Sequence, residues 1–146
     1  MIKYDELILT LIQATVARKL TWSQSSVQGG YITKINNSGI EVIPPLPLSQ
    51  GNIIGLALTS SIINPEDPQK RDELLIQREW RVVVYDSVGN KEFIITESKL
   101  NLDFFQNEFG AELTSPINFL HHAIRTVEEN TKSERLSGLI DAIKEI

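Results

Sequence analysis

The sequence predicts an α+β fold in which an antiparallel meander of four to five strands carries helices on one face. Two segments, at residues 28–44 and 80–96, have the alternating β-branched and aromatic pattern of hairpins. Helical periodicity is confined to the N-terminal segment and to the chain after Thr96. Because the strands and helices are segregated, an antiparallel sheet is favoured over alternating βαβ units.

The segment from Trp80 to Thr96 predicts the central hairpin. Asp86-Ser-Val-Gly89 separates its two β-rich halves. An aspartate can accept hydrogen bonds from the turn backbone, and a glycine adopts the left-handed conformation that a type I turn with a bulge requires. We therefore expect a tight turn here.

Neighbouring strand residues point to opposite faces, so the first strand of this hairpin has two different surfaces. The more polar one carries Arg81 and Tyr85. We expect it to be less buried, and these two residues are candidates for contact with a partner or ligand. One face holds Trp80, Val82 and Val84, and the other holds Arg81, Val83 and Tyr85.

An amphipathic helix is predicted over residues 3–20, with acids in its first turn and Arg18 and Lys19 in its last, as the helix dipole favours. Packing on the chain's own sheet is favoured over a partner-binding role. Trp22 follows in a loop. We interpret it as a lid on the edge of the core, with a binding role as the alternative.

The other hairpin, over residues 28–44, has the turn Asn36-Asn-Ser-Gly39, and we expect the same turn chemistry as in the central hairpin. Pro44-Pro-Leu-Pro47 ends the strand, because proline cannot donate to the sheet. This proline run is interpreted as a connector, in preference to a polyproline II ligand.

A Pro-rich and polar insertion is expected at about residues 45–73 of a single domain spanning 1–146. Its apolar part at 53–63 is interpreted as a buried strand, with a short helix as the competing structure. Residues 64–73 are charged and contain two prolines, which predicts an exposed loop. Extended structure resumes at 74–79.

Two to three helices are predicted after the sheet. A short buried one should end near Gly110, and Ser115-Pro116 is a typical N-cap followed by proline at the first helical position. That helix should run to about Glu129. Thr131 and Glu134 have the spacing of a capping box, which predicts a separate last helix with its own apolar face, formed by Leu136, Leu139, Ile140 and Ile143.

The composition disfavours several classes of function. The net charge of −5 disfavours a broad electrostatic grip on nucleic acid. The absence of cysteine removes disulfides and thiolate chemistry and agrees with a reducing compartment. No apolar stretch approaches the roughly 20 residues that span a bilayer, and the acidic N-terminal segment is unlike a secretory signal. We therefore expect a cytoplasmic protein without membrane or nucleic-acid partners.

Chemistry-bearing residues are few. His121 and His122 are adjacent and diverge by about 100° on a helix, so they cannot chelate one metal together. His121 lies beside the apolar face, and a structural role is favoured over catalysis. No nucleophile elbow, nucleotide-binding glycine motif or calcium loop is present in the sequence. No catalytic residue, metal or cofactor is therefore predicted.

Three segments, together with a C-terminal two-helix tail, resemble a group of small bacterial proteins that is frequent in cyanobacteria. They are Lys19-Leu-Thr-Trp-Ser23, Gly30-Tyr-Ile-Thr-Lys-Ile35 and Val84-Tyr-Asp-Ser-Val-Gly-Asn90. The resemblance covers most of the chain except residues 45–73. It implies a helix, a strand meander and C-terminal helices. Its motifs are turns and core positions, so it implies no catalytic residue.

The leading hypothesis is a non-enzymatic protein-interaction or regulatory module that self-associates. It rests on a half-polar sheet and on apolar helix faces. The alternative is a small-molecule-binding protein or an enzyme that uses the Arg81 and Tyr85 face or His121. A deep pocket around these residues would favour the alternative. The candidate contact residues are Arg81, Tyr85, Trp22 and His121.

Overall fold

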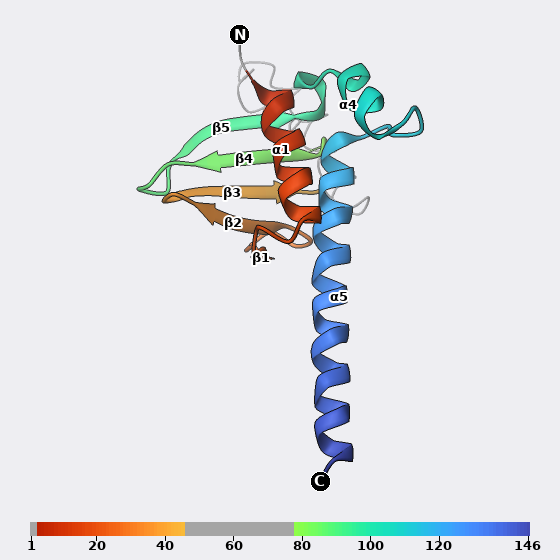
Figure 1. Cartoon of the computed structure of the whole chain (residues 1–146). Helices are drawn as coiled ribbons and strands as arrows, with labels where there is room; N and C mark the ends of the chain where they lie inside the picture. The colour runs from red at the N-terminus through yellow and green to blue at the C-terminus, as the bar shows by residue number, and fades with distance from the viewer. Residues whose placement is uncertain (1–2, 46–77) are drawn as a thin grey trace, which may run out of the picture.

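Figure 1 shows a computed structural model of the chain, which describes residues 3–45 and 78–146. The five strands pair with their neighbours in sequence order, all antiparallel, so the predicted α+β class and the meander are confirmed. The elements are α1 (Tyr4–Val16), β1 (Ser23–Gln24), β2 (Tyr31–Ile35), β3 (Ser38–Ile43), β4 (Arg81–Tyr85), β5 (Lys91–Thr96), the 3₁₀ turn η1 (Glu97–Lys99), α4 (Leu102–Phe109) and α5 (Pro116–Lys144).

The predictions for residues 53–63 and 64–73 lie outside the described residues, as does most of the extended segment expected at 74–79. The division into one domain with an insertion at 45–73 stays a prediction. The strand that precedes this region ends at Ile43, directly before Pro44, as the proline run predicts.

The helices lie over one face of the sheet (Figure 1). Alternate residues of the strands meet the apolar sides of α1, α4 and α5 there, because side chains in a strand alternate between faces. The resulting core joins segments that are more than a hundred residues apart in the sequence. Its fully buried members include Ile8 and Ile12 from α1, Val42, Val82 and Ile95 from the sheet, Phe105 from α4, and Ile117, Leu120 and Ile124 from α5.

The turn between β2 and β3 differs from the prediction. Ile35 pairs with Ser38, so only Asn36 and Asn37 form the turn, with φ of 49° and 70°. Asparagine tolerates the left-handed region, and two such residues in succession match the two-residue turn that suits the twist of a hairpin. Gly39 therefore lies within β3, opposite Lys34. The predicted shared turn chemistry of the two hairpins is wrong.

The turn between β4 and β5 agrees with the prediction. The Asp86 carboxylate accepts hydrogen bonds from the backbone N–H of Val88 at 3.1 Å and of Asn90 at 2.9 Å. Gly89 has a φ of 89°, and the strand register shifts next to Tyr85. An aspartate that caps the turn and a glycine that relieves its strain explain why this hairpin was recognisable from the sequence.

Helix α1 ends four residues earlier than predicted. The N–H of Lys19 donates to Ala14 O at 2.9 Å and that of Arg18 to Thr15 O at 3.0 Å, and Arg18 has a φ of 59°. This pair of bonds around a left-handed residue is a Schellman motif, which terminates a helix. The expectation that Arg18 and Lys19 complete the last helical turn is therefore wrong.

Helix α5 is one continuous helix of 29 residues. Its N-terminus agrees with the prediction, because the Ser115 hydroxyl accepts from Asn118 N–H at 3.2 Å and Pro116 opens the helix. The predicted break at 128–132 is wrong. Thr131 donates instead to Val127 O at 2.9 Å inside the helix, and no glycine or proline interrupts this stretch.

Candidate functional site

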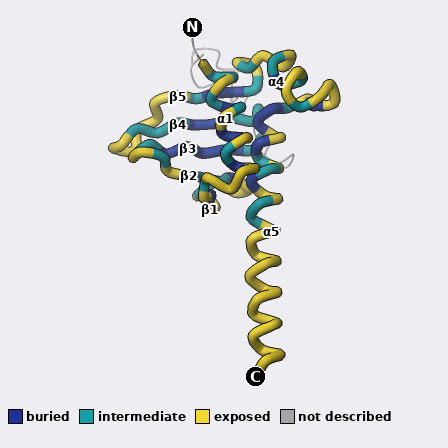
Figure 2. The backbone as a smooth tube through the Cα atoms, in the orientation of Figure 1, coloured by how far each residue is buried: buried dark blue, intermediate teal, exposed yellow. Residues whose placement is uncertain are grey.

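The C-terminal half of α5 projects away from the rest of the described structure (Figures 1 and 2). From Glu129 to Ile146 every residue is exposed, and we call this range the projecting segment. It carries four large aliphatic side chains with i, i+3, i+4 and i+7 spacing, which places them on one side of the helix. This apolar stripe consists of Leu136, Leu139, Ile140 and Ile143, with exposed fractions of 59%, 52%, 50% and 66%.

The apolar stripe does not continue the buried face of α5. At 100° per residue, its centre lies roughly 120° around the helix axis from the centre of Ile117, Leu120 and Ile124, which are all fully buried. A straight helix cannot turn both faces toward the same sheet. The change of direction explains why the sequence pattern predicted two helices, and it keeps the stripe out of the core that the described residues form.

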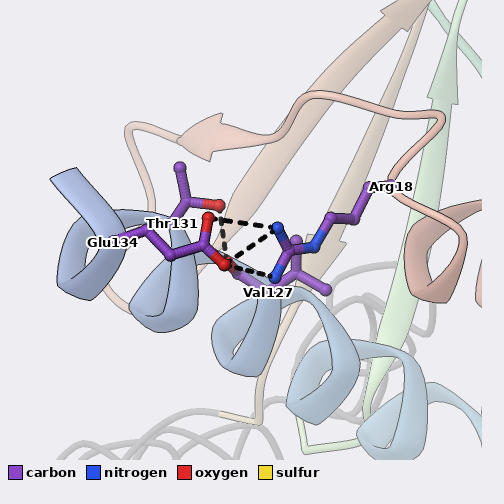
Figure 3. A network of polar contacts seen from close by, with 4 residues as sticks. All are labelled: Arg18, Val127, Thr131 and Glu134. Carbon is purple, nitrogen blue, oxygen red and sulfur yellow. Dashed lines mark hydrogen bonds and ion pairs between the residues drawn. The ribbon is translucent and has the colours of Figure 1, made fainter. Parts of the chain in front are cut away.

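An ion pair marks the end of the contact between α5 and the rest of the described chain. The Arg18 guanidinium donates to both carboxylate oxygens of Glu134, with N–O distances of 3.2–3.3 Å (Figure 3). Both side chains are about half exposed or more, so the pair positions the helix at a modest energetic value. Beyond Glu134, the helix continues for about three turns with its stripe uncovered.

The face of the sheet opposite the helices holds Arg81 and Tyr85. Both are partly buried, and Val83 between them is 2% exposed. Val83 lies in the middle of the sheet between Glu41 and Ile94, and flanking side chains cover such a central position. On the helix side of β4, Trp80 and Val84 are also partly buried and Val82 is buried, so the two faces have the same burial pattern. The expectation that the Arg81 face is the less buried one is therefore wrong.

The Tyr85 hydroxyl donates a 2.6 Å hydrogen bond to Oε1 of Glu41, whose residue is only 4% exposed. Burial, and then the bond and the negative charge of Glu41, raise the pKa of Tyr85 to about 12, so its phenol stays neutral. Burial lowers the pKa of Arg81, while the charge of Glu41 opposes that shift. Sequence reasoning missed Glu41, because a glutamate in an alternating strand is ordinarily solvent-facing.

An open pocket of about 370 Å³ adjoins this pair. Lys34 and Glu41 give it one positive and one negative side chain, and Tyr85 gives it an aromatic ring. Gly39 forms part of the floor, where an added Cβ would lie 3.5 Å from Tyr85, at ordinary contact distance. The pocket can offer charge, hydrogen bonds and an aromatic surface to a small polar molecule. Arg81 does not line it.

Trp22 lies on the opposite side of the sheet from this pocket, in the core. It is 5% exposed, and its indole Nε1 donates to the Thr15 hydroxyl at 3.1 Å. Thr15 is fully buried and donates in turn to Leu11 O at 2.7 Å. The indole N–H and the Thr15 hydroxyl are both hydrogen-bonded, so the contacts of Trp22 are those of a core side chain.

His121 is partly buried between two aromatic rings, with centroid distances of 4.9 Å to Trp80 and 5.2 Å to Tyr31. Its Nε2 lies 2.7 Å from Gly29 O, which ties α5 to the loop before β2. Burial lowers the pKa of His121, and the charge of Arg125 acts in the same direction. The four predicted contact residues therefore occupy three separate places, and only Arg81 and Tyr85 share a face.

Comparisons of the chain with protein-family models, with curated proteins and with solved structures give no match. Within residues 3–45 and 78–146, no group of three or more His, Cys, Asp or Glu side chains is arranged to hold a metal ion. None of the helices in the described ranges combines the length and apolar character needed to cross a membrane.

Proposed function

We propose that the chain is a non-enzymatic protein-interaction module that binds its partner through the apolar stripe of α5. The supporting observation is that four neighbouring leucine and isoleucine side chains are at least half exposed on the part of α5 beyond its ion pair with Arg18. A contiguous apolar surface of this kind is typical of interaction sites. An amphipathic helix presents such anchors to a groove or to another helix.

The energetics favour a covered state. Fully burying a leucine or isoleucine is worth roughly 1.5–3 kcal/mol, and the stripe residues still expose half or more of their surface, so a partner can gain roughly 1 kcal/mol from each. The helical turns beyond Glu134 contribute no residue to the core that the described residues form. An isolated helix of that length is marginal in water, and a partner would stabilise it.

The first test compares two double variants that add the same charge to the projecting segment. Leu139→Lys with Ile143→Lys places two lysines in the stripe. Ser137→Lys with Gly138→Lys places them on the other side of the same helix, where nothing lies within 4 Å of an added Cβ at Gly138. Lysine is a good helix former, so both variants should keep α5.

Native mass spectrometry of the tagged chain in a lysate of its own host supplies the measurement. We expect the wild type and the Ser137/Gly138 control to be in assemblies heavier than the 16.5 kDa chain, and the stripe variant to be at the chain mass. A stripe variant that keeps the mass of the wild-type assembly would show that the stripe is not the binding surface.

The pocket beside Tyr85 favours a second candidate function, the binding of a small polar ligand. The observation that favours it is a glutamate that is 4% exposed in a sheet and contributes to an open pocket next to Lys34. A ligand that carries both charges, such as a free amino acid, would pair with these side chains. Equilibrium dialysis against a mixture of radiolabelled amino acids tests it, with Glu41→Gln and Lys34→Gln as variants. Equal retention by wild type and both variants would exclude this site.

A further inference from the structure

We infer that the partner of the apolar stripe is a second copy of this chain, with the projecting segment of one copy packed against that of the other. This inference rests on the proposed interaction function and names its partner. A two-fold symmetric contact requires a surface that is complementary to itself. A stripe made only of leucine and isoleucine meets this requirement, because it matches an identical stripe without any polar atom to satisfy.

The charges of the projecting segment favour self-association over a charged partner. The projecting segment has three basic and four acidic residues, so its net charge is only −1 although the whole chain carries −5. Two such segments can approach with little net repulsion. An anionic membrane surface would call for a polar face rich in lysine and arginine, which this segment lacks. The seven charged residues are Glu129, Lys132, Glu134, Arg135, Asp141, Lys144 and Glu145.

The geometry leaves room for the second copy. Paired helices lie about 8–10 Å apart, so bulky elements next to the contact would prevent pairing. Here the sheet and α1 lie on the buried face of α5, roughly 120° around the axis from the stripe. Two helices that meet through their stripes therefore direct their sheets away from each other.

The spacing fits helix-on-helix packing. Leu136 and Ile143 are seven residues apart, and Leu139 lies between them at the intermediate position, as in the repeat that places apolar residues at a and d of a heptad. Towards the sheet, the equivalent positions are the charged Lys132 and Glu129. The contact is thus limited to the last three turns of α5. Such a small interface predicts a concentration-dependent dimer with a dissociation constant on the order of micromolar.

Sedimentation equilibrium of the purified full chain tests the inference, because no other protein is present. We expect wild type and the Ser137→Lys with Gly138→Lys control to approach twice 16.5 kDa as the concentration rises. Leu139→Lys with Ile143→Lys should weaken association roughly 100-fold or more, since four buried aliphatic contacts are lost per dimer. Circular dichroism at matched concentrations checks that each variant remains folded.

The absence of cysteine allows a second, geometric test. Single cysteines are introduced at Leu139 and Ile143, in the stripe, and at Gly138, on the other side, and are oxidised under mild conditions. A disulfide-linked dimer of Ile143→Cys alone indicates parallel helices. A mixed dimer between Leu139→Cys and Ile143→Cys chains indicates antiparallel ones. Either result supports the inference, and preferential linkage through Gly138→Cys overturns it.

The two proposals fail in different ways. A pure chain that stays at 16.5 kDa at every concentration overturns self-association. The wild type can still form an assembly in the lysate that the Leu139→Lys with Ile143→Lys variant does not form. In that case the stripe is an interaction surface, and its partner is another protein. If that assembly is unchanged in the variant, the module itself is wrong. Wild-type binding to vesicles of anionic lipid without dimerisation would also overturn the inference.

Discussion

Arg18 and Glu134 form a bidentate ion pair that joins the turn after α1 to α5 across 116 residues of sequence (Figure 3). Arg18 holds this position in the left-handed conformation, at the place in a Schellman motif where glycine is the usual residue. A non-glycine residue is strained there by roughly 1 kcal/mol. The ion pair and the strain thus act on stability in opposite directions at one residue.

Arg18→Gly and Arg18→Ala separate these two effects. Both remove an exposed ion pair worth roughly 0.2–1 kcal/mol, but only glycine also relieves the strained φ. We expect Arg18→Gly to unfold at nearly the wild-type urea concentration and Arg18→Ala to be less stable than Arg18→Gly by roughly 1 kcal/mol. Equal stabilities of the two variants would show that the φ of 59° costs nothing.

Asn37→Gly should stabilise the β2–β3 hairpin. Asn36 and Asn37 both have positive φ, and Asn-Gly is the preferred pair for a two-residue turn of this kind. We expect a gain of up to about 1 kcal/mol in the free energy of unfolding, measured with urea. Asn37→Val, with a β-branched side chain in the left-handed region, should lose at least as much. Loss of stability with glycine would contradict the turn geometry.

His121 should make the protein less stable at mildly acidic pH. Burial holds its pKa below the ordinary value of 6.5, so the unfolded chain binds the proton more tightly than the folded one. The stability that the neutral His121 contributes to the folded state is therefore complete above pH 6.5. It is lost as the pH falls through the lower pKa of the folded state. Urea unfolding at a series of pH values from about 7.5 to about 5 measures how the free energy of unfolding changes with pH.

His121→Gln is the matched variant for that experiment. Glutamine can still donate to Gly29 O but does not titrate. We expect its stability to vary less with pH than that of the wild type over the same range. Identical pH profiles would assign the acid sensitivity to other groups.

Tyr85 should ionise later than an ordinary tyrosine. Its pKa of about 12 exceeds the usual 10.0, so the folded state retains the proton longer than the unfolded state. The stability linked to Tyr85 is present below pH 10.0 and is lost as pH rises toward 12. In an alkaline titration, the phenolate absorbance of the wild type should rise in a last step when Tyr85 loses its proton. The Tyr85→Phe variant should lack that step. In Glu41→Gln that step should move to lower pH yet stay above 10.0, because burial is the largest cause.

Local chemistry made the two hairpins and the start of α5 predictable from the sequence. The Asp86 and Gly89 turn and the Ser115 cap depend on residues within a few positions of one another, so their patterns carry the structure. The Asn36 turn shows the limit of this reasoning. Asparagine and glycine both supply a positive φ, and only the pairing of Ile35 with Ser38 decides which residues do so.

The candidate site was predictable only in part. The sequence identified Leu136, Leu139, Ile140 and Ile143 as one apolar face, but it could not say whether a sheet covered them. Likewise, it placed Arg81 and Tyr85 on one face but not the buried Glu41 that bonds to Tyr85. Contacts between distant strands and helices set these properties, and no local pattern records them.

By itself, the sequence determined the α+β class, the hairpins that became β2–β3 and β4–β5, and the apolar side of each helix, because side-chain period and turn chemistry act over a few residues. It missed β1, since the polar residues Ser23–Gln24 predicted a loop. Only the tertiary structure decided that Ile124 is buried and Ile143 exposed on the same helix. The physical reason is that, among the described residues, the sheet and α1 bury only the N-terminal half of α5, up to Ile124. An apolar face becomes core only where another element reaches it.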